Sequence, residues 1–302
     1  MYLYKNSDLN YYINFEKWIP KCGIIKGGGI EVEGMLYIVP TPVGNLKDIT
    51  YRAIEVLKSS DYIYCEDTRT SAVFLNFYDI KTERRSFHKF NERSKVDEII
   101  ELVYSGKTIS VISDAGTPGI SDPCGILVSE IDAKFVRTLP GATAFVPALV
   151  NSGLSTDEFT FIGFLPPKKN ERMKKLESLV DMTQTLIFYE SPHRAEETLL
   201  DMQTVFKTRN AALVREISKI YEETLRFNFS EIPFDKITFK GEMVILVEGG
   251  EEKAVDIWPR VRELMEAGMS AKSILKQIKE EYKNEEIKRN EIYDFVLKNS
   301  KE

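Results

Sequence analysis

Short apolar runs alternate with amphipathic segments of helical period between residues 36 and 150. The runs "LYIV", "DYIYC" and "TISVI" have the length of strands. Between the second and third runs, Val96, Ile99 and Val103 fall on one helical face. Strands that alternate with helices at this spacing are typical of a parallel sheet covered by helices. The pattern therefore predicts an α/β fold here, with Asp48 and Ser94 as the N-caps of two of its helices.

The second half of the chain keeps the strands but loses the regular alternation. Strand-like runs occupy 185–190, 211–217, 222–230 and 241–249, and short links join the last three. Ser191-Pro192 has the order of a helix start, because proline is favoured at the first helical position. This half is predicted to be α+β with more antiparallel pairing.

Three short helical patterns follow, at 256–265, from Ser270 onwards, and at 288–298. They predict a small bundle, which could be of the helix-turn-helix kind, although helix packing alone explains them. The polar stretch 151–160 is the expected boundary between the two larger domains. The expected organisation is an extension at 1–34, an α/β domain at 35–152, an α+β domain at 153–250 and a helical tail at 255–302.

Residues 1–34 lack the apolar core and cleavage site of a secretory signal, and they show no clear helical or strand period. The first confident strand follows Met35 directly. One hypothesis is that Met35 is the natural start and that the leader is an upstream extension, which a native terminus at Met1 in mass spectrometry would contradict. A flexible arm is an equal alternative.

Composition narrows the class of protein. No apolar stretch approaches the roughly 20 residues that a membrane helix needs. The three cysteines form no C-x-x-C, which favours a reducing, cytoplasmic setting without zinc or disulfides. Two histidines are too few for a His-rich metal site, so no metal is expected. The net charge of −6 argues against wholesale wrapping of nucleic acid but leaves room for a local basic patch.

Three strands of the first half end in unusual loops, "PTPVGN", "SDAGTPGISDP" and "PGATA". In a parallel sheet these loops share one edge, where ligands bind. Glycine lets the backbone approach a ligand closely, and proline limits the entropy lost on binding. A ligand pocket explains all three loops together. "SGKT" at 105–108 is not a P-loop, because position 101 is Glu101 and Thr108 begins a strand, and no G-x-G-x-x-G is present.

The motifs "LYIVPTPVGNLKDIT", "EDTRTS", "SDAGTPGISDP", "PGATA", "FIGFLP" and "YESPHR" together resemble one known family. This is the RsmI family of small-subunit ribosomal RNA 2′-O-methyltransferases, within the tetrapyrrole methylase superfamily. The resemblance runs from about Leu36 to Gly250. It implies a two-domain tetrapyrrole-methylase-like fold, a homodimer, and S-adenosylmethionine held between the domains. The implied reaction is methyl transfer to the ribose 2′-hydroxyl of a cytidine in the decoding region.

The resemblance also implies cofactor-binding residues, although "PTPVG" replaces the superfamily's glycine-rich first turn and Ser113 and Ala115 replace the neighbours usual for its acidic residue. The positions that match are Val43, Gly44, Asp114, Thr117, Thr143, Ala144, Tyr189 and Leu246.

A neutral hydroxyl nucleophile favours a base to remove its proton. Candidate catalytic residues in the matched motifs are Glu66, Asp67, His88, Glu92, Glu190 and His193. RNA contact needs positive charge. The expected RNA-binding residues are Arg69, Lys89, Arg93 and Arg194, with Lys168, Lys169 and Arg172 close to the same motifs.

Structural roles remain open for each of these residues, because Glu66, Asp67 and Arg69 could simply pair or cap a helix. At the level of function, three alternatives also remain open. They are a methyltransferase of the same fold that acts on a tetrapyrrole, a non-catalytic ribosome-assembly factor that binds RNA, and a nucleotide-binding regulator.

Overall fold

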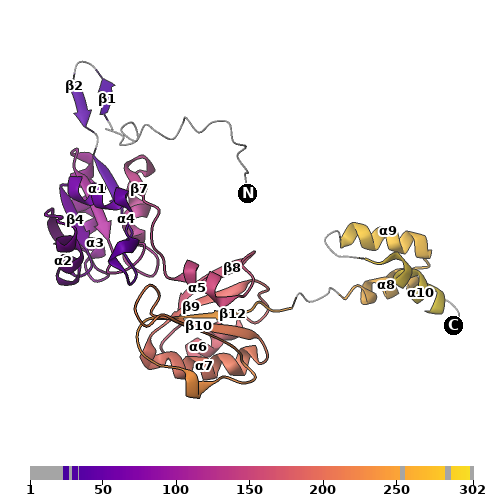
Figure 1. The fold of residues 1–302 in the computed structure, drawn as a ribbon. Coiled ribbons are helices and arrows are strands. Elements are labelled where there is room, and N and C mark those ends of the chain that lie inside the picture. Colours follow the sequence, from indigo (N-terminus) through magenta and orange to yellow (C-terminus); the bar gives the residue numbers. More distant parts are fainter. Residues whose placement is uncertain (1–22, 27–28, 33, 252–255, 283–286, 300–302) are drawn as a thin grey trace, which may run out of the picture. The chain divides into compact units, whose positions relative to one another are not determined.

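The computed structural model describes residues 23–26, 29–32, 34–251, 256–282 and 287–299 (Figure 1). The chain forms two compact units, residues 1–249 and 250–302. The larger unit contains two five-stranded sheets, and each sheet with its helices is called a lobe below. Among the described residues, no helix is long and apolar enough to cross a membrane.

The sheet of the first lobe is parallel throughout, which confirms the prediction. Its strand order is β5-β4-β6-β3-β7. The strands are β3 (Met35–Ile38), β4 (Tyr62–Cys65), β5 (Glu83–Ser86), β6 (Thr108–Ile112) and β7 (Val136–Thr138). The edge strand β5, with the sequence "ERRS", carries no apolar run, so no pattern in the sequence indicated a strand there. Because all five strands run the same way, their carboxyl ends share one edge.

Helices cover both faces of this sheet (Figure 1). The helices of the first half are α1 (Tyr51–Ser59), α2 (Thr68–Phe77), α3 (Glu92–Tyr104), α4 (Gly125–Glu130) and α5 (Phe145–Ser152). One core cluster joins α3 and α4 to the strands through Ile99 and Leu127, which are fully buried. A second cluster joins α1 and α2 to the opposite face through Leu57 and Leu75. The apolar residues that recur with helical period in the sequence are therefore the ones that these helices bury against the sheet.

Both predicted N-caps of the first lobe are wrong by a few residues. Thr50, not Asp48, caps α1, and its hydroxyl accepts from the Ala53 N–H at 3.1 Å. Asp48 instead lies in a short 3-10 helix at 46–48. The N-cap of α3 is Asn91, three residues before Ser94. In both cases another polar residue lies two or three positions away from the predicted cap. The period of the apolar residues alone does not show which of the two polar residues is the cap.

The second lobe has a mixed sheet, as predicted. Its order is β11-β10-β12-β9-β8, and the pairings are antiparallel except β8 with β9. The strands are β8 (Phe159–Phe164), β9 (Thr185–Glu190), β10 (Asn210–Arg215), β11 (Glu223–Asn228) and β12 (Met243–Val247). Helices α6 (Lys169–Glu177) and α7 (Pro192–Phe206) pack on one face, and α5 packs on the other. Ser191 is the N-cap of α7 and Pro192 its first residue, as expected.

The second unit is a bundle of α8 (Trp258–Glu266), α9 (Ala271–Glu281) and α10 (Arg289–Asn299). A small core that includes Val261, Ile274 and Ile292 holds it together. Ser270 caps α9, as predicted, by accepting from the Ser273 N–H. The expected helical tail is therefore confirmed as a bundle (Figure 1).

The leader contains two short strands that its sequence did not indicate. Strand β1 (Gly23–Lys26) pairs with β2 (Gly29–Val32) in an antiparallel hairpin. Residues 1–22 lie outside the described residues, so the hypothesis of an upstream extension stays untested. The predicted boundaries at 152 and 250 likewise stay predictions.

Candidate active site

The three unusual loops of the first lobe are joined into one structure at the carboxyl edge of its sheet. Thr41 and Gly116 exchange both backbone hydrogen bonds at 2.9 Å, which ties the first loop to the second. The Thr117 hydroxyl donates to the Ala142 carbonyl at 3.1 Å, which ties the second loop to the third. Strands β6, β3 and β7 are adjacent in the sheet, so these loops meet as the sequence predicted.

A cavity of about 500 Å³ lies between these loops and the second lobe. Backbone and side chains of Asp114, Gly116 and Thr117 line its first-lobe wall. Tyr189 at the end of β9, Ile217 after β10 and Val244 on β12 line the second-lobe wall. The volume and the mixture of apolar wall with a few polar groups are typical of a small-molecule site.

Gly44 fixes the distance between the two walls. A side-chain Cβ at this position would lie 2.4 Å from the Ile217 carbonyl oxygen and 2.6 Å from the Lys219 side chain. Only a residue without Cβ allows this contact, so Gly44 packs against the second lobe beside the cavity.

Six of the eight residues expected to bind the cofactor line the cavity, namely Val43, Asp114, Thr117, Thr143, Ala144 and Tyr189. Gly44 borders it through the contact just described. Leu246 is fully buried in the apolar cluster behind the cavity wall, where it packs with Val43 and Val244, and it is not among the lining residues.

Acidic side chains from the loops after two strands, β4 and β6, converge at the first-lobe side of this site. Burial raises the pKa of Glu66, and the charge of Asp114 adds to this rise while His88 opposes it. Burial also raises the pKa of Asp114, against the hydrogen bond from the Asp67 N–H. Asp122, which lines the cavity, has its pKa raised to about 6 by burial and by the charges of Glu66 and Asp114. Like charges that cannot separate favour the protonated form.

Two of the candidate bases have structural partners. Asp67 caps α2, and its carboxylate accepts from the N–H groups of Arg69 and Thr70. The hydrogen bond to the Arg69 N–H leads the causes that lower the pKa of Asp67. Glu92 is buried, and its carboxylate accepts from the N–H groups of Cys124 and Ile126. These two hydrogen bonds cap the start of the short helix α4. Both carboxylates are therefore held by backbone donors at helix starts, which makes them less suited to act as bases.

The histidines lie in different surroundings. His88 follows β5, and its buried Nδ1 atom has no hydrogen-bond partner among the residues that the structure describes. It also lies close enough to Glu66 to influence the charge of that carboxylate. His193, in the first turn of α7, is exposed and is not among the lining residues. Of the two, His88 is the one near the converging acids.

The "YESPHR" motif forms a buried network at the start of α7. Glu190 accepts from the Thr198 hydroxyl and from the Ser191 N–H, both at 2.8 Å. Arg194 lies 3.4 Å from the same carboxylate and donates to the carbonyls of Leu165 and Pro166. Arg194 therefore links Glu190 to the loop after β8 and helps to hold that loop in place. In these contacts the Arg194 guanidinium points towards the protein.

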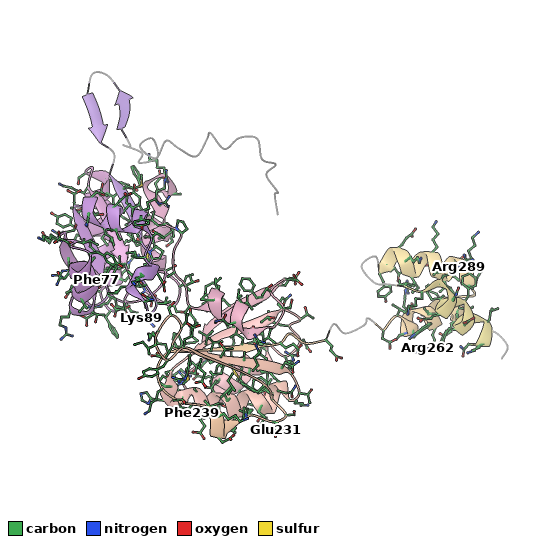
Figure 2. All side chains as sticks on the ribbon, viewed as in Figure 1. Phe77, Lys89, Glu231, Phe239, Arg262 and Arg289 are labelled. Atoms are coloured by element: carbon green, nitrogen blue, oxygen red, sulfur yellow. The ribbon has the colours of Figure 1, made fainter. Side chains whose placement is uncertain are left out.

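The other basic residues divide by exposure. Arg69, Lys89 and Arg93 are exposed on the first lobe, where Figure 2 labels Lys89. Arg69 pairs with Asp67, and Arg93 pairs with Glu130. Arg172 is fully buried instead, so the structure removes it from the expected RNA-binding rim.

Several lining residues of the quoted motifs were not predicted from the sequence, among them Asp122 and Phe164. Asp122 is the second acid of "SDAGTPGISDP", and Phe164 is the last aromatic of "FIGF". Asp122 lies in the loop after β6 and Phe164 is the last residue of β8, and these positions at or after a strand end were the available signal.

Comparison with known proteins agrees with this geometry. The family model described as Tetrapyrrole (Corrin/Porphyrin) Methylases matches residues 35–233 of this chain. The structure resembles the methyltransferase CobJ (TM-score 0.54, 17% identity, 72% of this chain and 94% of that one). It also resembles diphthine synthase (TM-score 0.55, 14% identity, 71% of this chain and 90% of that one). At these identities the two structures support the fold alone. Because the family model covers about two thirds of the chain, the chain belongs to the tetrapyrrole methylase family.

Curated relatives narrow the assignment within that family. The relative from Halalkalibacterium halodurans is 42% identical over 82% of this chain and 90% of its own length. Those from Bacillus subtilis and Streptococcus pyogenes are 44% and 38% identical, over 74% and 87% of this chain and 78% and 94% of their own lengths. All three are named ribosomal RNA small subunit methyltransferase I. The chain is a methyltransferase of this group, which confirms the resemblance found in its motifs.

Proposed function

We propose that this enzyme transfers a methyl group from S-adenosylmethionine to the ribose 2′-hydroxyl of a cytidine in the decoding region of small-subunit ribosomal RNA. The names of the relatives support the RNA as substrate. The observation that carries the proposal is the cavity in which three strand-end loops of one lobe face β9, β12 and the segment after β10 of the other.

The residues of this cavity fit the cofactor. Val43, Ile217 and Val244 supply apolar surface for an adenine ring, and Thr117 and Thr143 supply hydroxyls. The Asp114 carboxylate on the first-lobe wall attracts the positive charges of the amino group and the sulfonium. When bound, the cofactor supplies an electrophilic methyl group.

The chain then has to align the acceptor and exclude water. Loops that are hydrogen-bonded to each other keep their shape when substrate binds, so little entropy is lost. The rings of Phe161 and Phe164 lie 4.9 and 5.7 Å from that of Tyr189, which builds an aromatic wall beside the cavity. Phe164 is 55% exposed, and an exposed aromatic ring suits the stacking of an unpaired base.

The RNA backbone has a basic surface available on the same lobe as the three loops. Arg69, Lys89 and Arg93 are exposed there and follow the strands β4 and β5. Exposed cations on one lobe reconcile RNA binding with a net charge of −6. We propose these residues as phosphate contacts, whereas Arg194 holds the loop after β8.

We also propose that the enzyme is a cytoplasmic homodimer. Both described cysteines, Cys65 and Cys124, are free and buried, as expected in a reducing compartment. Val146 and Val150 on α5 are 47% and 66% exposed, and Phe159 on the edge strand β8 is 44% exposed. This apolar face is a suitable contact for a second copy. Analytical ultracentrifugation should give a dimer for the wild type and a monomer for Val150→Glu.

The test of the reaction uses small subunits from cells that lack this modification. The enzyme is incubated with methyl-labelled S-adenosylmethionine, and the RNA is then hydrolysed in alkali. A labelled linkage at a cytidine that resists hydrolysis supports the proposal, because a methylated 2′-oxygen cannot attack the phosphate. Unlabelled RNA with cofactor bound to the enzyme contradicts it, and labelling of a tetrapyrrole instead would identify the alternative substrate.

A further inference from the structure

The carboxylates that line the cavity differ in their partners. Those of Glu190, Glu216 and Asp114 each accept a hydrogen bond from the protein, and Glu242 forms an ion pair with Lys219. Within the described part of the chain, no hydrogen bond or ion pair is formed by the Asp122 carboxylate. It is the lining acid whose lone pairs are left for a ligand.

The loop holds Asp122 in this position under backbone strain. Ser121, immediately before it, has φ of +70°, a left-handed conformation that is uncommon for a residue with a side chain. Strained residues of this kind are found preferentially at functional sites, where the surrounding structure enforces them. The loop is fixed at its other end by the Thr41–Gly116 and Thr117–Ala142 hydrogen bonds.

The groups around Asp122 come from both lobes. Glu66 after β4 and Asp114 after β6 act on it from the first lobe. Tyr189 on β9 faces it from the second lobe, because the charge of Asp122 adds to the burial that raises the pKa of that phenol to about 12. In the part of the chain that the structure describes, no ion pair joins a cation to Asp122, and burial together with two like charges raises the pKa of Asp122 to about 6. A carboxylate in this range is ionised at neutral pH and accepts a proton more readily than an ordinary aspartate does.

We propose, on the basis of the function proposed above, that Asp122 is the general base that removes the proton from the ribose 2′-hydroxyl. As the oxygen forms its bond to the methyl carbon, the O–H bond breaks and the proton moves to the Asp122 carboxylate. The electron pair of the carbon–sulfur bond stays with sulfur. A sulfonium, an alcohol and a carboxylate thus become a thioether, an ether and a carboxylic acid, and charge and atoms balance.

The neighbouring acids are less suited to this role. Glu66 does not line the cavity, and Asp114 accepts from the Asp67 N–H and stands at the position expected to hold the cofactor. Their charges act on Asp122 instead, because each favours its protonated form. Glu66 and Asp114 therefore tune the base electrostatically.

The test compares wild type with Asp122→Asn and Asp122→Glu in single-turnover methylation of small subunits. Asp122→Asn should lose roughly 10²- to 10⁴-fold in rate, the usual contribution of a general base. Its dissociation constants for cofactor and RNA, measured by calorimetry and filter binding, should change less than about threefold, since the side chain keeps its shape. Asp122→Glu should recover part of the rate. Asp97→Asn, an exposed aspartate on α3, is the matched control and should behave as wild type.

The pH profile separates a base from a residue that only shapes the loop. At low cofactor concentration, the pH dependence of kcat/KM reports the ionisation of the free enzyme. The kcat/KM of wild type should therefore fall about tenfold per pH unit below pH 6. The residual activity of Asp122→Asn should not show this fall. A normal rate in Asp122→Asn, or the same acid limb in both proteins, would overturn the role of Asp122. Failure of wild type to methylate ribose would overturn the proposed function as well.

Discussion

The two lobes hold several of their acidic residues in opposite ways. In the second lobe, Glu190 is bonded to Thr198 and Ser191, and Asp201 lies 2.7 Å from the buried Arg172. In the first lobe, Glu66 and Asp122 form no ion pair among the described residues, and the charge of Glu66 raises the pKa of Asp122. Asp67 and Glu92 of the same lobe cap helices. The second-lobe acids named here hold loops in place, whereas Glu66 and Asp122 remain available for chemistry.

This difference shows how to separate structural from functional carboxylates. A buried acid with matched donors contributes to stability, because removing one partner leaves a charge without compensation. A buried acid without donors costs stability and persists where function requires it. The predictions below test this contrast, beginning with the largest expected effect.

Arg172→Ala should strongly destabilise the second lobe. Arg172 is fully buried, donates to Asp201 and to the Pro167 carbonyl, and pairs with Glu197. Its removal leaves Asp201 buried without its main partner, which costs about 3–5 kcal/mol. The melting temperature should fall by on the order of 10 °C. As a control, the double variant Arg172→Met/Asp201→Leu removes both charges and should recover most of the loss.

Gly44→Ala should push the two walls apart. The new methyl group would lie 2.4 Å from the Ile217 carbonyl, so one lobe has to move, at a cost of about 1–3 kcal/mol. The dissociation constant of S-adenosylmethionine in calorimetry should rise roughly tenfold, the equivalent of about 1.4 kcal/mol. Gly125→Ala is the matched control, because nothing lies within 4 Å of its Cβ position. Equal cofactor affinity in both variants would contradict the role assigned to Gly44.

Asp122→Asn should raise stability at neutral pH while it lowers activity. The pKa of Asp122 is about 6 in the folded protein, above its usual 3.8, so the folded state holds a proton more tightly than the unfolded state. The ionised group is therefore destabilising above pH 6, and this penalty disappears as the pH falls towards 4. The melting temperature of the variant should exceed that of wild type by a few degrees at pH 7.5. The two curves should converge near pH 4, and a variant less stable than wild type at pH 7.5 would contradict an unpartnered carboxylate.

Charge reversal at Arg69 and Arg93 should affect RNA binding without affecting the cavity. Both side chains are largely exposed, so their pairs with Asp67 and Glu130 contribute little to stability. Each substitution should weaken binding of the small subunit a few-fold and reduce the slope of log affinity against log salt by about one. Cofactor affinity should stay at the wild-type value. Lys58→Glu, at the exposed end of α1, is the control, and unchanged RNA methylation in Arg69→Glu/Arg93→Glu would contradict the basic rim.

Much of the fold could be predicted from local pattern. The buried strands, the helical faces and the order of Ser191 and Pro192 were readable because each depends on neighbours within one turn or one strand. The charged edge strand β5 and the exact caps of α1 and α3 were not, since edge pairing and the choice between adjacent polar residues depend on contacts distant in sequence.

The site divides in the same way. The sequence by itself determined the parallel sheet and the loops that follow β3, β6 and β7, because strand period and the spacing of glycine and proline are local properties. Tertiary structure alone decided which acids are neutralised. Glu92 caps α4 across 32 residues of chain, whereas Asp122 meets Glu66, Asp114 and Tyr189 without a donor. The protonation of a carboxylate depends on burial and on charges that folding brings near, and neither is written in its immediate neighbours.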